Sequence, residues 1–565
     1  MTVREVLGID LGTTNSAASL WLDGRPVLVP NRHGHLLTPS VVGLDDHGNI
    51  LIGQSAYARL ISHPHMTKAS FKRHMGSSTK IQIGHLSFRA EEISALLLRQ
   101  LKEDVETWNK GSFTDAVITV PAYFNDVQRR AVKTAGQLAG LNVVRLLNEP
   151  TAASLAFGLL ENHEQKYLTF DLGGGTFDVS IIDMFEGVVE VRASCGDVML
   201  GGDDFSEAIC RWMLEVHPDL EQYIPQIHPS LLAQAEAMKR SISLNSNGKA
   251  ELTWGGKEWL WSLDEHQFAQ SCQPLLERLQ QPIMQALHDA RFSLSDLDHI
   301  LLVGGATRMP LIRQTVARLF GRFPRYDLNP DEAVALGAGV QAGMIMADSA
   351  VEEIILTDVM PFTLGIEIAK QHSGQLEEGF FLPLIERNTF LPVSIMKRVC
   401  TVFDNQKVVL VKIFQGEARR VKDNVFLGEM SVEVPPKKAE EVSLDVRFTY
   451  TVDGLLEIQC SHDDATVPIC MVIEKVPGQM SEKQIAESLQ RLSNLKQNPR
   501  DNPINRALLD RGARLFNVLL GDERQWADTV ITAFEQALDS QDPRQIALTR
   551  QRVEAALDRL DDGTS

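Results

Sequence analysis

The chain has 565 residues, a formal net charge of −19 and a hydrophobic content of 44%. This length exceeds what one hydrophobic core serves, so we expect three or four globular domains. An acidic chain is a poor candidate for nucleic-acid binding, which usually needs a basic surface. No run reaches the ~18 apolar residues of a membrane-spanning helix, and we expect neither a membrane segment nor a signal peptide. The six cysteines have no metal-ligand spacing, which favours free thiols in a reducing cytoplasm.

Two segments, 8–16 and 171–178, each contain a strand that ends in Asp-Leu-Gly, then a tight turn and threonines. Three consecutive glycines in the second turn permit positive φ angles, and successive N–H groups in such a turn converge on an anion. Asp10 and Asp171 end the two strands, where carboxylates would repel a bare phosphate unless a cation such as Mg²⁺ lies between them. Either turn alone is equally compatible with an ordinary hairpin. The pair predicts a duplicated, two-lobed fold around a nucleotide cleft.

Strands and helices alternate through the first 347 residues, which predicts an α/β class. Glu149 falls where a strand meets a helix, a common position for a catalytic group. The helix dipole would also stabilise a carboxylate there without any catalytic role. The periodicity predicts strands at 3–9, 17–22, 116–120, 143–147, 167–170, 179–182 and 300–303, and helices at 90–108, 127–139, 151–160, 205–216, 231–243, 310–320 and 333–347.

Helix 231–243 carries charged and polar residues on a single face, either as a salt-bridged surface or as the wall of a polar site. The residues on this face are Glu236, Lys239, Arg240 and Ser243. Strand 300–303 leads into Gly304 and Gly305 and then a helix, which is a third nucleotide-type turn. The chain has no Gly-x-x-x-x-Gly-Lys-Ser/Thr motif, so it is not a P-loop enzyme.

The pattern changes after about residue 347, where short alternating strands replace the α/β alternation. Several such strands at short spacing predict a β-sandwich. Its strands are expected at 362–368, 392–403, 408–415, 427–434, 442–450, 455–461 and 467–476. From 477 the chain becomes helical, beginning with a capping box at 481–484. A small bundle is expected from helices at 482–496, 505–520, 523–538 and 543–560.

The order of these motifs resembles the DnaK-type, seventy-kilodalton heat-shock chaperones over nearly the whole chain. The matching segments are 8–16, 117–126, 148–153, 171–178, 201–205, 303–310, 329–335, 358–367 and 415–417. The short C-terminal region is most similar to the HscC-type subfamily. The resemblance implies an actin-like ATPase domain (1–347), a linker (348–357), a β-sandwich peptide-binding domain (358–476) and a helical lid (477–565).

The resemblance also implies the residues of an ATP site. Asp10 and Asp171 would hold Mg²⁺ through water, and K⁺ is a further candidate ion. Lys72, Glu149 and Asp171 would position and polarise the attacking water, with Thr176 nearby, because phosphoryl transfer depends on positioning and charge neutralisation. Thr13, Thr14 and Thr176 would bind the phosphates of ATP or ADP, and the turn at Gly201 and Gly202 would close over them. Further nucleotide-binding positions are Gly12, Gly173, Gly174, Gly175 and Gly304. The adenosine would lie against Glu236, Lys239, Arg240, Ser243, Gly305, Arg308 and Asp331.

The resemblance further implies a cleft for extended apolar segments of unfolded clients, formed by main-chain bonds and one apolar pocket. The cleft positions are Ile366, Ile368, Val399, Val402, Val408, Val409 and Val411, and the alternative for each is a place in the ordinary sandwich core. A J-domain partner and interdomain coupling are expected at Pro121, Arg129, Arg145, Asn148 and Asp358. The apolar linker that docks when ATP is bound comprises Ile354, Ile355 and Leu356. We expect a cytoplasmic monomer; the client and the exchange factor stay open.

Several positions depart from the family pattern. The two residues that arch over the peptide fall at Ala369 and Val402, so the arch is small or reshaped. Segment 370–382 is longer than the family's loop, which leaves the alignment at Ala369 open. Thr357 replaces an apolar linker residue, which weakens docking. The lid region is short and lacks an acidic tail, so we expect a specialised chaperone that holds clients weakly.

Two other classes remain as alternatives. A sugar kinase of the actin-like superfamily would use the same phosphate loops, and sugar-stimulated ATP turnover would reveal it. An actin-like filament protein would show ATP-dependent sedimentation. Both classes would lack the C-terminal third of this chain.

Overall fold

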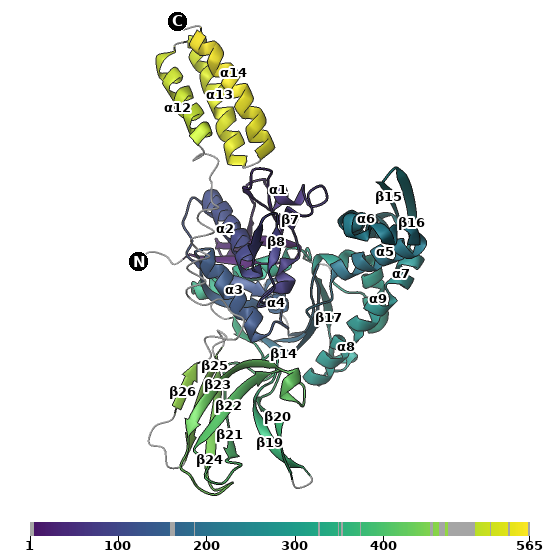
Figure 1. The fold of residues 1–565 in the computed structure, drawn as a ribbon, viewed down its shortest axis with the longest axis vertical. Coiled ribbons are helices and arrows are strands. Elements are labelled where there is room, and N and C mark those ends of the chain that lie inside the picture. Colours follow the sequence, from purple (N-terminus) through teal and green to yellow (C-terminus); the bar gives the residue numbers. More distant parts are fainter. Residues whose placement is uncertain are drawn as a thin grey trace.

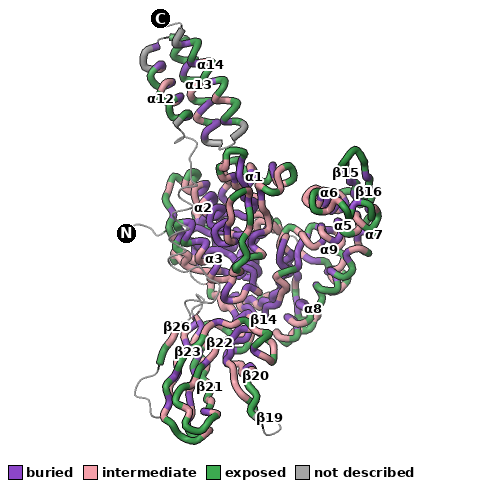
Figure 2. The backbone as a smooth tube through the Cα atoms, in the orientation of Figure 1, coloured by how far each residue is buried: buried purple, intermediate pink, exposed green. Residues whose placement is uncertain are grey.

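The computed structural model describes twelve stretches of the chain, and every structural statement below concerns them. They are residues 5–158, 164–185, 187–325, 328–348, 350–351, 354–372, 375–451, 456–462, 469–472, 503–519, 521–540 and 543–562. Two α/β lobes lie side by side in Figure 1, the β-rich region lies below them, and a helical group lies at the C-terminal end. Figure 2 shows buried residues concentrated inside the two lobes and between the layers of the β-rich region.

The first lobe is built on a mixed sheet in the order β11-β10-β1-β2-β3. The apolar strand β1 pairs in parallel with β10 and antiparallel with β2. Helices α2 (Ala90–Asn109) and α3 (Asp126–Leu138) pack on this sheet and share its hydrophobic core. The strands are β1 (Val6–Asp10), β2 (Asn15–Leu22), β3 (Arg25–Val29), β4 (Thr38–Pro39), β10 (Asp115–Val120) and β11 (Asn142–Asn148).

The second lobe repeats this plan. Its sheet runs β17-β12-β13-β14-β18, and β12 pairs in parallel with β17 and antiparallel with β13, as β1 does with β10 and β2. The two sheets therefore confirm the duplicated, two-lobed fold that the twin Asp-Leu-Gly turns predict. The strands are β12 (Gln165–Leu172), β13 (Phe177–Phe185), β14 (Val188–Asp197), β17 (His299–Val303) and β18 (Ile355–Thr357).

Helices cover the second sheet and join the lobes. Helix α4 (Glu149–Gly158) packs against α10 (Ala333–Ile345), whose Gly and Ala residues permit close approach. Helix α10 lies on β1, β2, β3 and β10 of the first sheet, and α4 contacts strands of both sheets. Helix α9 (Pro310–Phe320) begins with proline at its first turn and ends at Gly321 with φ 65°, as its sequence predicts. The other helices of this lobe are α5 (Gly202–Val216), α6 (Ile224–Asn245), α7 (Glu265–Ser271) and α8 (Gln273–Ala290).

Smaller elements complete both lobes. The second lobe carries the antiparallel hairpin of β15 (Asn247–Trp254) and β16 (Lys257–Asp264). The first lobe carries a short helix and a 3₁₀ helix between small strand pairs. These are α1 (Gln54–Tyr57), η1 (Phe71–His74), β5 (Val42–Leu44), β6 (Ile50–Ile52), β7 (Thr67–Lys68), β8 (Ile81–Ile83) and β9 (Leu86–Phe88).

The β-rich region consists of two four-stranded sheets, β20-β19-β22-β23 and β21-β24-β25-β26. Side chains from both sheets form one hydrophobic cluster, which confirms the predicted β-sandwich. Strand β24 buries Leu444, Val446, Phe448 and Tyr450, as its alternation predicts. The strands are β19 (Leu364–His372), β20 (Gln375–Ile385), β21 (Val393–Cys400), β22 (Val408–Gln415), β23 (Val425–Glu433), β24 (Ser443–Tyr450), β25 (Leu456–His462) and β26 (Ile469–Val472).

One element of the sandwich differs from expectation. Segment 370–382 was expected to be a loop insertion, but most of it forms paired strand in β19 and β20. The pairing register shifts between Ile368 and Lys370, so Ala369 lies in a bulge. The extra residues therefore lengthen a hairpin instead of a loop.

Three helices follow at the C-terminal end, and Figure 1 draws them beyond α1, away from the sandwich. They share a hydrophobic cluster that includes Leu515, Phe534 and Leu557, as a small bundle requires. The predicted helix at 482–496 and its capping box lie outside the described residues. The three helices are α12 (Pro503–Val518), α13 (Gly521–Ser540) and α14 (Pro543–Asp562).

Candidate functional site

The cleft between the lobes is lined by the ends of corresponding strands. Asp10 is the last residue of β1, and Asp171 lies one residue before the end of β12. Thr119, near the end of β10, donates a hydrogen bond of 2.8 Å from Oγ1 to Asp10 Oδ1. Thr176 lies in the turn after β12 and is buried, and its carbonyl oxygen accepts a 3.0 Å hydrogen bond from Gly173 N–H. Because the lobes are duplicates, the same strand end delivers a carboxylate from each side.

A buried ion pair lies between these carboxylates. Lys72 Nζ, on η1 of the first lobe, is 2.6 Å from Glu149 Oε1 at the start of α4. The exposed fractions of the two side chains are only 3% and 10%. Glu149 thus lies at the strand-to-helix junction that the sequence predicts, and the structure brings Lys72 to it across 77 positions of sequence.

Negative charge dominates this part of the cleft. Burial and the nearby Glu149 raise the pKa of Asp10 to about 7, against the opposing effect of Lys72. Burial, Glu149, Asp178 and Asp10 together raise the pKa of Asp171 well above its usual range. Burial also raises the pKa of Asp178 to about 7. One lysine cannot balance four carboxylates, so the donor set suits a divalent cation with oxygen ligands such as Mg²⁺.

The threonine turn of the first lobe faces the glycine turn of the second across the cleft. A Cβ atom built on Gly174 would lie 1.8 Å from Thr14 Oγ1, and one on Gly175 would lie 2.6 Å from Thr13 Cγ2. A Cβ on Gly201 would lie 2.5 Å from the carbonyl oxygen of Gly174. Only glycine fits these positions, and the close threonine hydroxyls and turn backbones form a cradle that fits phosphate oxygens.

The predicted adenosine residues on α6 form a hydrogen-bonded network with the phosphate side. Glu236 pairs with Lys239 at 2.5 Å and with Arg240 at 2.8 Å. Lys239 Nζ also donates to the carbonyl oxygen of Gly202 at 2.7 Å, which joins α6 to the start of α5. The hydroxyl of Ser243 instead donates to the carbonyl oxygen of Lys239 in its own helix.

The opposite wall comes from the turn after β17. Gly304 has φ 82°, and a Cβ there would lie 2.4 Å from the carbonyl oxygen of Leu172. Arg308 pairs with Asp331 at 2.6 Å, and a Cβ on Gly305 would lie 2.7 Å from Asp331 Oδ1. The side chains of Arg240 and Arg308 are 60% and 51% exposed, so both remain accessible to a base.

Two residues that the sequence analysis did not select connect the lobes directly. Arg73 of the first lobe donates to the carbonyl oxygen of Gly175 at 3.0 Å and pairs with Asp204 at 2.5 Å in the second. Ser70 donates to Asp203 at 2.6 Å. Arg73 follows Lys72 on the same short element, and that adjacency was the only signal available in the sequence.

We expect Arg73→Gln to accelerate release of ADP by roughly tenfold or more. The variant loses the charged contact with Asp204, and a hydrogen bond to a charged group contributes about 1.5–3 kcal/mol. Stopped-flow displacement of a fluorescent ADP analogue measures the rate. Arg32→Gln is the matched control, because Arg32 pairs with Asp104 inside the first lobe. Equal release rates for both variants would contradict a lobe-bridging role.

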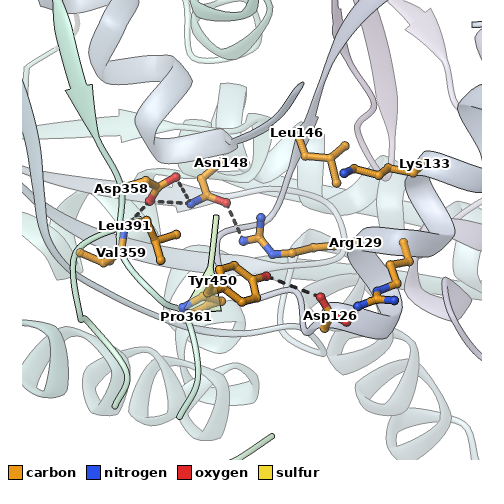
Figure 3. A pocket seen from close by; sticks show the side chains of 11 residues that line it. Asp126, Arg129, Lys133, Leu146, Asn148, Asp358, Val359, Pro361, Leu391 and Tyr450 are labelled. Carbon is orange, nitrogen blue, oxygen red and sulfur yellow. Dashed lines mark hydrogen bonds and ion pairs between the residues drawn. The ribbon is translucent and has the colours of Figure 1, made fainter. Parts of the chain in front are cut away.

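A second polar group lies where the sandwich meets the first lobe (Figure 3). Asn148 Nδ2 donates to both carboxylate oxygens of Asp358, at 2.9 and 2.8 Å, and Arg129 donates to Asn148 Oδ1 at 2.6 Å. Burial raises the pKa of Asp358, while Arg129 and Arg145 oppose that effect. Of the residues predicted for partner binding and interdomain coupling, Arg129, Asn148 and Asp358 are therefore joined by hydrogen bonds. Pro121 is buried directly after β10, and its carbonyl oxygen accepts a hydrogen bond from Phe124 N–H.

The linker forms a strand of the second lobe. Ile355, Leu356 and Thr357 of β18 pair in parallel with Val188, Val189 and Glu190 of β14. Ile354 and Leu356 pack against the cluster around α4 and α10, whereas Ile355 is 58% exposed. Thr357 Oγ1 is buried without a hydrogen-bond partner. A threonine in place of an apolar residue therefore makes docking of the linker less favourable.

The sandwich also touches both lobes directly. Asp126 N–H donates to Gln415 Oε1 at 3.0 Å, and Tyr450 faces Asp126 in Figure 3. Arg387 pairs with Asp289 of α8 at 2.8 Å. The rings of Tyr123 and Phe362 lie 4.3 Å apart. The sandwich is therefore docked on the two lobes in this structure.

Five of the seven predicted peptide-cleft positions share the sandwich's hydrophobic cluster: Ile366, Ile368, Val399, Val409 and Val411. Val408 is 46% exposed on the opposite face of β22, because side chains alternate along a strand. Val402 lies after β21, where its N–H donates to Gln406 Oε1. The cluster members are equally consistent with core and cleft, so the peptide assignments stay predictions.

No helix among the described residues is long and apolar enough to span a bilayer. A family model described as "Hsp70 protein" matches residues 6–83 and 78–562. The chain is 40% identical over 477 residues to the "Chaperone protein DnaK" of Thermotoga neapolitana and to that of Thermotoga petrophila. Each alignment covers 80% of this chain and 77% of the relative.

Proposed function

The chain belongs to the Hsp70 family, and from this premise we propose how its ATP site and its sandwich act together. As a member of that family it is an ATP-dependent molecular chaperone that hydrolyses ATP and binds unfolded segments of client proteins. We assign the ATPase domain to residues 1–347, the linker to 348–357, the peptide-binding sandwich to 358–476 and the lid to 477–565. The sugar kinase and filament alternatives do not explain the docked sandwich.

The hydrolytic roles follow from charge and position in the cleft. Bound Mg²⁺ neutralises phosphate charge, and Asp10 and Asp171 would hold it through water. Lys72 Nζ holds Glu149 in place through the 2.6 Å contact, and this pair would orient the attacking water beside Thr176. The turns at 12–14, 173–176 and 201–202 would hold the phosphates. The adenosine would lie between the walls that carry Arg240 and Arg308.

The pairing of β18 with β14 is the single observation that best supports coupling between the ATP site and the peptide-binding sandwich. This pairing makes the linker part of the ATPase sheet, and the contact of Asn148 with Asp358 fixes the sandwich beside it. We infer that ATP favours this docked arrangement and that ADP favours release of the linker. Because coupling is reciprocal, a peptide that prefers the undocked sandwich must in turn promote hydrolysis.

We also propose a partner, a further ion, an oligomeric state, a location and a subfamily for this chain. A J-domain partner would bind near Arg145 and Asn148, and K⁺ would accompany Mg²⁺. We propose a monomer in the cytoplasm and a place in the HscC-type subfamily. The bulge at Ala369, where the arch over the peptide is expected, supports weakly held clients. Peptide exchange in the ADP state as slow as that of a DnaK relative would contradict this.

We expect Val409→Phe to abolish stimulation of the ATPase by short apolar peptides and to weaken peptide binding at least tenfold. Phenylalanine would fill the apolar pocket to which the half-buried Val409 contributes. Steady-state ATP hydrolysis with and without a peptide panel measures the stimulation, and fluorescence anisotropy measures peptide binding.

Leu410→Phe is the matched control, because Leu410 is the next residue of β22 and is 47% exposed on the opposite face. Basal ATP hydrolysis should be unchanged in both variants, since β22 contributes no residue to the nucleotide cleft. An ATPase that no peptide stimulates would contradict the coupling. Equal losses in both variants would contradict the assignment of the pocket.

A further inference from the structure

Three side chains with different donor atoms meet on the second lobe, and none of them belongs to the residues assigned to the nucleotide site. Glu207 and Cys210 lie one turn apart on α5, and His228 lies on α6. One ligand atom from each, the carboxylate oxygen, the thiol sulfur and an imidazole nitrogen, all lie within 4.8 Å of one another. His228 Nε2 is 3.6 Å from Glu207 Oε2. No other group of three such residues is this close within the described part of the chain.

We propose that Glu207, Cys210 and His228 form a Zn²⁺ site that joins α5 to α6. A thiolate, an imidazole and a carboxylate are the donors that zinc prefers, and three protein ligands leave one tetrahedral position for water. Zinc–ligand bonds of 2.0–2.3 Å place neighbouring ligand atoms about 3.3–3.6 Å apart. The pair of His228 and Glu207 already has this spacing, and the Cys210 sulfur lies within 4.8 Å of both, so zinc binding requires only a small movement of side chains.

The surroundings allow metal entry and favour a defined site. Cys210 is buried, whereas the side chains of His228 and Glu207 are 41% and 43% exposed. The metal therefore reaches the thiol from the solvent side, and the open position faces water. Cysteine binds zinc as the thiolate, so formation of the Zn–S bond breaks the S–H bond and releases one proton to the buffer.

The site lies on the two helices that line the nucleotide cleft. One turn before Cys210, Ser206 of α5 donates a hydrogen bond of 2.6 Å to Glu236 of α6. Lys239 of α6 donates to the carbonyl oxygen of Gly202, the first residue of α5. A zinc ion on Cys210 and His228 adds a further connection between the same helices. Bound metal should therefore slow amide hydrogen exchange in α5 and α6, with or without nucleotide.

The first test is a Zn²⁺ titration of the full-length, nucleotide-free protein after chelator treatment, in competition with a chromogenic chelator. We expect one tight equivalent in the parent protein. Cys210→Ser, His228→Gln and Glu207→Gln should each weaken binding at least tenfold. Cys470→Ser and His266→Gln are the matched controls, because both residues are exposed and lie on other elements, and they should bind as the parent does.

The second test identifies the ligands by spectroscopy, with Co²⁺ as the probe. A thiolate ligand produces a sulfur-to-cobalt charge-transfer band, which should disappear in Cys210→Ser and persist in Cys470→Ser. Near-ultraviolet circular dichroism establishes that each variant is folded, and His228→Gln tests a half-exposed position if Cys210→Ser is unstable. No tight zinc equivalent, no charge-transfer band, or unchanged affinity in both Cys210→Ser and His228→Gln would overturn the site.

Discussion

Lys72→Met should reduce the single-turnover rate of ATP hydrolysis by about 10²–10³-fold while ATP binding persists, as expected when one preorganised electrostatic group is removed. Lys72 is buried and forms the 2.6 Å contact with Glu149. It is also a cation that lowers the pKa values of Asp10, Asp171 and Asp178, against the effect of burial. Its loss leaves Glu149 without its partner and the carboxylates without a balancing charge, so the attacking water is no longer oriented.

Rapid-quench measurement with one equivalent of ATP separates this loss from changes in product release. The matched control is Lys80→Met, because Lys80 is exposed in the same lobe and should not affect the rate. ATP affinity and circular dichroism establish that the variant is folded. A loss smaller than tenfold, with intact binding, would show that Lys72 and Glu149 form a structural ion pair.

Asp358→Ala should uncouple ATP binding and hydrolysis from peptide binding and release, without impairing either activity by itself. The carboxylate of Asp358 accepts two hydrogen bonds from Asn148, which in turn holds Arg129. Hydrogen bonds to a charged group contribute about 1.5–3 kcal/mol, so their loss should lower the ratio of docked to undocked sandwich at least tenfold. We therefore expect near-normal ATP binding, loss of peptide stimulation, and loss of peptide release when ATP is added.

Hydrogen exchange in β18 reports docking directly, because its amides are protected only while it pairs with β14. In ATP, exchange in this segment should be fast in Asp358→Ala and slow in the parent. Asp423→Ala is the control, since Asp423 is exposed in the same domain. If the variant retained peptide stimulation and a protected β18, this contact would not be the coupling element.

Local chemistry made much of the fold predictable. The repeated Asp-Leu-Gly turns, the apolar strands and the capped helices identify their own ends, and α9 matches its predicted range of 310–320. Strand β22 likewise matches 408–415. The strand β20 was missed because long-range pairing with β19 stabilises it, and Gly379 and Pro383 inside its sequence weaken the local strand signal.

The residues of the candidate site also fall into those that the sequence identifies and those that only the tertiary structure reveals. The sequence alone determined which residue types end the strands: Asp10, Asp171 and the glycines that leave no room for a Cβ atom. Only the tertiary structure decided that Arg73 reaches Asp204 across the cleft, that Asn148 holds Asp358, and that β18 joins a sheet. Turn chemistry acts between neighbouring residues, so the sequence carries it; these contacts join residues far apart, and packing alone brings them together.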